Sequence, residues 1–81
     1  MSSKLKTLNK PTDLKTLQGL VQGLIEVITL ENGDQIIVNE EGLLLGLPIN
    51  EEASEIVSSH FGFPQAIVGN AVILKGEARL T

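Results

Sequence analysis

Few side chains in this sequence could take part in catalysis, and their spacing argues against it. His60 is the only histidine, and it directly follows Ser58 and Ser59. Neighbouring residues on a helix point in different directions, so these serines and the histidine do not form a nucleophile–base pair. A histidine near the end of a helix is favoured there by the helix dipole. We therefore expect His60 to be structural, and we expect no catalytic residue and no enzyme.

Two pairs of adjacent glutamates, Glu40/Glu41 and Glu51/Glu52, are the remaining groups that could do chemistry. The first pair lies in turn-forming sequence and the second in a first helical turn, where acidic side chains are common. Neither pair has the spacing of a calcium-binding loop. The chain has no cysteine, which excludes thiol catalysis and Cys-ligated zinc. We expect no cofactor and no metal; a small enzyme with a carboxylate-bound metal is the least favoured alternative.

The charges are separated along the chain. All six basic residues lie near the ends, whereas residues 16–74 contain eight acidic residues and neither Lys nor Arg, which gives this span a charge of −8. Such a charge repels nucleic-acid phosphates and attracts basic protein surfaces. We expect a protein partner with a basic surface and no direct nucleic-acid partner, although acidic residues can also serve solubility alone. The predicted partner surface comprises Glu40, Glu41, Glu51, Glu52 and Glu55.

The length of 81 residues allows one domain. Residues 1–10 are polar and lysine-rich, and we expect them to form a flexible basic tail. The alternative is an edge strand that begins at Leu5 and Leu8. Residues 11–81 are then a single domain. No apolar run approaches the ~18 residues that a membrane span needs, so we expect a soluble, cytoplasmic protein without a membrane partner.

The clearest structural signal is the dipeptide Asn32-Gly33 between two β-branched apolar runs. This pattern is typical of a β-hairpin with a two-residue type I′ turn. Such a turn would place Ile28 opposite Ile37. Ile25 and Val27 would then lie on the other face of the hairpin, which is more apolar and is the expected core side.

Apolar residues from Leu14 to Leu24 recur at helical spacing, and Thr12 or Asp13 is the expected N-cap. Asn50 is the expected N-cap of a second helix that ends at Gly62. Residues 43–48 are apolar but interrupted by Gly and Pro, and we expect a buried extended segment there. Residues 71–74 predict a further strand. The fold class is therefore α+β: a small antiparallel sheet of about three strands, with a central Asn-Gly hairpin, packed on one face against two helices.

Three motifs carry a resemblance to a known family: Gln22-Gly-Leu-Ile-Glu-Val-Ile, Val38-Asn-Glu-Glu-Gly42 and Gly46-Leu-Pro-x-Asn50. The chain resembles a family of small bacterial, plasmid and phage proteins over roughly residues 13 to 75. That family is a domain of unknown function, loosely associated with plasmid antirestriction proteins. The resemblance implies no established activity or cofactor, and no catalytic residue.

Two functions follow from these observations. The first is a small, acidic, non-catalytic binding or accessory module that acts through protein–protein interaction. The second is an antirestriction-like inhibitor that occupies a DNA-binding enzyme. A compact apolar patch around Ile28, Ile37 and Leu44 would favour the first, and regularly spaced carboxylates on one exposed face would favour the second.

Overall fold

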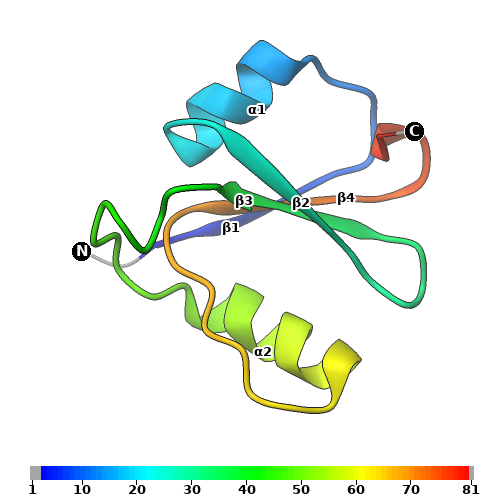
Figure 1. Ribbon diagram of the computed structural model, residues 1–81. Coiled ribbons are helices and arrows are strands. Elements are labelled where there is room, and N and C mark those ends of the chain that lie inside the picture. Colours follow the sequence, from blue (N-terminus) through cyan, green and yellow to red (C-terminus); the bar gives the residue numbers. More distant parts are fainter. Residues whose placement is uncertain (1–2, 81) are drawn as a thin grey trace.

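The computed structural model describes residues 3–80 and contains one mixed sheet with two α-helices (Figure 1). Within these residues the sheet has four strands in the order β1-β4-β3-β2, so the α+β class is confirmed with one strand more than expected. The expectation of an antiparallel sheet is wrong for one pair, because β1 pairs with β4 in parallel. The elements in chain order are β1 (Leu5–Leu8), α1 (Leu14–Val21), β2 (Ile25–Thr29), β3 (Gln35–Asn39), α2 (Glu51–Phe61), β4 (Ala71–Leu74) and the 3₁₀ turn η1 (Gly76–Ala78).

The additional strand, β1, lies within the segment expected to be a flexible tail. It pairs in parallel with β4, from Leu5 opposite Ala71 to Leu8 opposite Leu74. Backbone hydrogen bonds continue the pairing at both ends, from the N–H of Ala71 to Lys4 O (2.9 Å) and from the N–H of Lys75 to Leu8 O (3.0 Å). The prediction of a flexible tail is therefore wrong for β1. The alternative, an edge strand at Leu5 and Leu8, is confirmed. Its parallel pairing with β4 has no local signal, because the partner is so distant in sequence.

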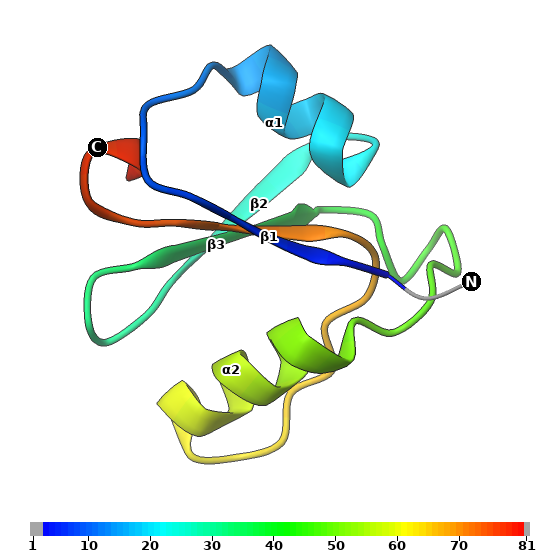
Figure 2. The same ribbon diagram turned by 180° about the vertical axis from the view of Figure 1, so that it is seen from behind.

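The two helices cover opposite faces of the sheet, as Figures 1 and 2 show from two sides. Each face has its own apolar core, because alternate residues of a strand point to opposite faces. The core under α1 contains Leu17, Val21, Ile37, Val72, Leu74 and Ala78, and the core under α2 contains Leu30, Ile36, Val38, Ala53, Val57, Ile67, Ala71 and Ile73. The expectation of both helices on one face is wrong. The continuous apolar runs of β3 and β4 suit strands that are covered on both sides.

The β2–β3 hairpin is confirmed, but its turn is longer than predicted. Leu30 donates its N–H to Asp34 O (2.8 Å), and Gly33 donates its N–H to Leu30 O (3.0 Å). The loop therefore has three residues, and only Gly33, with φ of +92°, adopts the left-handed conformation within it. This is the common three-residue loop, a turn that ends in a left-handed glycine.

The longer loop shifts the pairing by one residue, so that Ile28 lies opposite Ile36 and not Ile37. Because successive side chains of a strand point to opposite faces, a shift of one residue changes which side chains of the two strands share a face. Ile28 accordingly packs against the α2 core, while Ile25 packs against the α1 core. The predicted register and its apolar pair are wrong.

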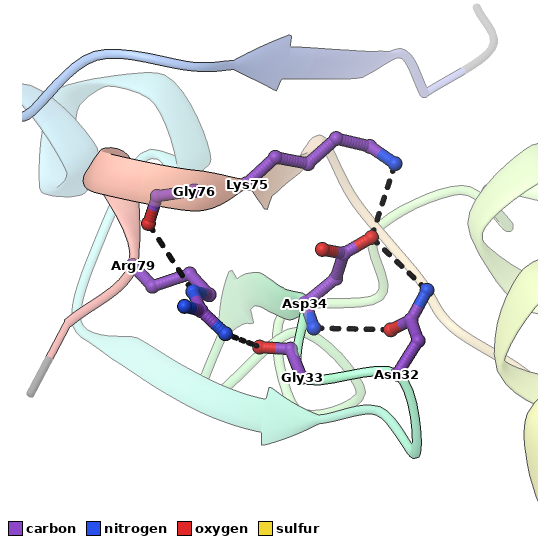
Figure 3. A network of polar contacts seen from close by, with 6 residues as sticks. All are labelled: Asn32, Gly33, Asp34, Lys75, Gly76 and Arg79. Carbon is purple, nitrogen blue, oxygen red and sulfur yellow. Dashed lines mark hydrogen bonds and ion pairs between the residues drawn. The ribbon is translucent and has the colours of Figure 1, made fainter.

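The tip of the hairpin is held by the C-terminal segment (Figure 3). Asp34 accepts hydrogen bonds from Asn32 Nδ2 (3.2 Å) and Lys75 Nζ (3.0 Å), and its N–H donates to Asn32 Oδ1 (3.0 Å). Arg79 donates from Nη1 to Gly33 O (3.3 Å) and from Nε to Gly76 O (3.2 Å). The basic residues near the C-terminus thus neutralise one end of the acidic hairpin.

Gly33→Ala is expected to lower the free energy of unfolding by about 1–2 kcal/mol, because a residue with a Cβ is strained at this φ. The added Cβ would also lie 2.8 Å from Arg79 Nη1 and displace that side chain. Urea denaturation measures the change. Gly19→Ala is the matched control, since Gly19 is inside α1 with nothing within 4 Å of the added Cβ. We expect the control to stabilise the protein by up to about 1 kcal/mol. If Gly33→Ala also stabilised the protein, the left-handed conformation assigned to Gly33 would be contradicted.

Both predicted helix caps are confirmed. Asp13 Oδ1 accepts the N–H of Thr16 (2.8 Å) and Asn50 Oδ1 accepts the N–H of Ala53 (3.0 Å). Hydrogen bonds from the side chain and backbone of Thr16 hold the pKa of Asp13 below its usual value. Helix α1 ends at Val21, earlier than its apolar period suggests, because Gln22 takes a left-handed conformation with φ of 64°.

Candidate functional site: an apolar hollow beside β2

A hollow of about 340 Å³ lies beside β2, and we call it the β2 hollow. Its walls come from β2, the end of β3, the turn that follows β3, and residues 66–68. The lining is mainly apolar, with three glutamates among the lining residues. The apolar side chains are Ile28, Val38, Leu43, Leu44, Ala66, Ile67 and Val68, and the acidic ones are Glu26, Glu40 and Glu41.

The turn over residues 40–46, which we call the leucine turn, presents its leucines to solvent. Leu43, Leu44 and Leu45 are 79%, 86% and 58% exposed. The expectation of a buried extended segment over residues 43–48 is wrong. The turn closes on itself through the N–H groups of Leu45 and Leu47, which donate to Glu41 O (2.9 Å) and to Gly42 O (3.1 Å). Its backbone groups therefore need no sheet partner, and the side chains point outward.

Both ends of the leucine turn are anchored to the body of the protein. Before the turn, Asn39 accepts the N–H of Glu41 (2.8 Å) and donates from Nδ2 to Val21 O (3.0 Å) at the end of α1. After it, the N–H of Gly69 donates to Pro48 O (2.8 Å). The exposed leucines are thus held in place by a fixed backbone.

The five glutamates predicted as a partner surface are all exposed, but they do not line the same hollow. Glu40 and Glu41 line the β2 hollow, and Glu26 joins them there from β2. Sequence reasoning did not select Glu26 as part of the partner surface, although the predicted pairing of Ile28 with Ile37 implies that Glu26 lies opposite residue 39, next to Glu40. Glu52 and Glu55 line a separate hollow of about 370 Å³ on α2, together with Ile56, Ser59 and His60. Glu51 lines neither hollow.

Two serines of α2 have a structural role that the sequence did not indicate. Ser58 Oγ accepts the N–H of Gln65 (2.8 Å) and donates to its carbonyl (3.3 Å). Ser54 Oγ does the same with Ile67, at 2.8 Å and 3.2 Å. These hydroxyl groups hold residues 65–67 along the helix, and Ala66 and Ile67 of this segment line the β2 hollow.

In the described part of the chain, residues 3–80, no three His, Asp or Glu side chains are grouped so that they could hold a metal ion. Within the same residues, no helix has the length and apolar character that crossing a membrane requires.

A family model described as "Domain of unknown function (DUF3846)" matches residues 2–80, which is nearly the whole chain. No curated protein and no solved structure is significantly similar to the chain.

Proposed function

Because this chain belongs to the DUF3846 family of domains of unknown function, we propose a function from its surface: it is a non-catalytic module that binds a partner protein. The partner binds at the β2 hollow and the leucine turn. It contributes apolar side chains to the hollow and basic side chains to the glutamates around it.

The observation that carries this proposal is the exposure of Leu43 and Leu44 beside the β2 hollow. Burying an exposed leucine on association contributes about 1.5–3 kcal/mol before the costs of association. Adjacent exposed apolar side chains next to a hollow, with charged groups around them, are typical of interaction sites. Ile28 and Leu44, two of the three residues expected to mark an apolar patch, line this hollow together.

The charges around the hollow support a basic partner. Lys75 and Arg79 bind at the hairpin tip, at the opposite end of β2 and β3 from the leucine turn (Figure 1). Those two basic residues therefore do not neutralise Glu26, Glu40 and Glu41, and within residues 3–80 no ion pair involves any of these three glutamates. Exposed charges act over about 8 Å at physiological salt, and they speed the encounter with an oppositely charged surface.

The test is capture of partner proteins from an extract, followed by measurement of the dissociation constant with variants. Leu43→Ser/Leu44→Ser is expected to weaken binding by about tenfold or more, because both contacts lose their apolar burial. Leu14→Ser is the matched control, since Leu14 is also exposed (56%) but begins α1. The melting temperature of each variant is measured as well, to check that the variant retains the fold. Equal binding by the wild type and the double variant would overturn the proposal.

Charge variants separate the two groups of glutamates. Glu40→Lys/Glu41→Lys is expected to slow association with the partner, whereas Glu51→Lys/Glu55→Lys on α2 leaves association nearly unchanged. If Glu51→Lys/Glu55→Lys slowed association and Glu40→Lys/Glu41→Lys did not, the partner would bind at α2, which carries the other glutamates of the predicted partner surface.

An antirestriction-like inhibitor remains the second candidate, and the charge of −8 over residues 16–74 is the observation that favours it. An inhibitor of that kind would depend on carboxylates over the whole surface. Both pairs of charge variants would then weaken binding, and the leucine variant would leave it unchanged.

A further inference from the structure

The outer edge of β2 is free to bond another strand. β2 is the last strand of the sheet within residues 3–80. The N–H of Glu40 donates to Leu24 O (2.8 Å), and the N–H of Leu30 donates to Asp34 O (2.8 Å). In an antiparallel pair, the residues bonded to the partner alternate, so residues 24, 26, 28 and 30 bond toward β3. Ile25, Val27 and Thr29 therefore direct their backbone N–H and C=O groups away from the sheet.

The two edges of the sheet differ in how they are protected. Proteins commonly protect an edge strand from pairing by charged side chains, most often lysine, or by proline, a bulge or a short length. β1 is four residues long, contains Lys6 and follows Lys4. β2 has five residues without lysine or proline, and its pairing runs unbroken from Ile25 to Thr29. Its one charged residue, Glu26, would repel an acidic strand but attract a basic one. Its central residue, Val27, is 41% exposed. Of the two edges, β2 is the one that can accept a strand.

The β2 hollow begins at this same edge. Glu26 and Ile28 are both lining residues, and they lie on the face of β2 that is turned toward α2. A strand added beside β2 would lie about 4.8 Å away and would point every second side chain toward that face. Those side chains would meet Ile28, Leu44 and the carboxylate of Glu26.

We propose that the partner's docking segment is an extended peptide that pairs with the outer edge of β2. Toward the hollow it presents an apolar side chain with a Lys or Arg two residues away. This proposal rests on the proposed function and names the occupant of the same site. Charge complementarity selects the occupant, because the glutamates at the hollow favour a basic segment.

A second copy of this chain is the alternative occupant of the edge. Two β2 strands paired antiparallel about Val27 would bring the Glu26 side chains of both copies onto neighbouring diagonal positions. Like charges at these positions disfavour the pairing.

The probe is the acetylated and amidated hexapeptide Lys-Val-Leu-Thr-Lys-Val, which places Lys, Leu and Lys on one face. Amide resonances of β2 and the leucine turn are expected to shift on titration to about 1 mM peptide. Two control peptides have the same sequence but carry N-methyl groups on every second backbone amide. In one control the odd-numbered amides are methylated, and in the other the even-numbered amides. One of the two is expected to bind about tenfold or more weakly, because its methyl groups replace the amides that face β2.

The protein variant that tests the edge is Val27→Pro, which removes an outward N–H but no hydrogen bond to β3. It is expected to abolish peptide binding, while Val27→Thr retains it. If Val27→Pro does not fold, the two methylated peptides still decide the question.

Three results would overturn strand addition: no resonance shifts with the hexapeptide, equal binding by both methylated peptides, or a dimer in sedimentation equilibrium that the peptide cannot dissociate. The proposed function fails separately, when partner capture is insensitive to Leu43→Ser/Leu44→Ser. If Leu43→Ser/Leu44→Ser reduces partner capture but the hexapeptide does not bind, the proposed binding function stands and strand addition at the β2 edge is excluded.

Discussion

Asn50→Ala is expected to lower the free energy of unfolding by about 3 kcal/mol, well above the ~1 kcal/mol typical of losing a helix cap. Asn50 is only 1% exposed, and its Oδ1 caps α2 through the N–H of Ala53. Its Nδ2 also donates to Lys4 O and to Gly69 O, both at 3.0 Å. One side chain thus joins β1, α2 and the segment before β4. Alanine would leave a buried carbonyl without a donor in addition to removing the cap.

Two further variants divide this effect, and urea denaturation measures all three. Asp13→Ala removes the exposed cap of α1 and is expected to cost about 1 kcal/mol. Asn50→Ser keeps an oxygen that can cap α2 but loses both amide donors, so it is expected to fall between the other two. If Asn50→Ala cost no more than Asp13→Ala, the bonds to Lys4 and Gly69 would contribute nothing to stability.

Ile36→Ala and Ile37→Ala are each expected to cost about 2–5 kcal/mol, although the two residues are neighbours on β3. Both side chains are fully buried, Ile36 in the core under α2 and Ile37 in the core under α1. Each substitution leaves a cavity in a different core. In a sheet covered on one face only, one of two neighbouring residues would face solvent, and its substitution would cost little.

Val27→Ala is the control for this pair, because it truncates a partly exposed residue of the edge strand β2. We expect a loss below about 1 kcal/mol from it. The three losses are compared through the urea concentration at the midpoint of unfolding, provided that the dependence of the unfolding free energy on urea concentration is the same for each variant. A small loss for either Ile36→Ala or Ile37→Ala would exclude the arrangement with one helix on each face.

The sequence by itself determined the features that depend on neighbours a few residues apart. Asp13 and Asn50 cap helices by accepting N–H groups three residues ahead, so residue type and position were sufficient to predict both caps. The hairpin around Gly33 and the strand at Ala71–Leu74 were likewise predicted from local turn chemistry and apolar runs. The separation of charge along the chain is a property of the sequence alone, and the proposal of a basic partner starts from it.

The tertiary structure alone decided which side chains share a face and which are left exposed. Parallel pairing of β1 depends on β4, more than sixty residues away. The hairpin register differs from the predicted one by one residue, and contacts from Lys75 and Arg79 hold the loop that sets it. The leucine turn has an apolar sequence typical of a core, yet the sheet faces are already covered by α1 and α2, and its backbone bonds are satisfied locally. Its leucines are therefore exposed beside the β2 hollow, because burial depends on the position a segment takes among the others.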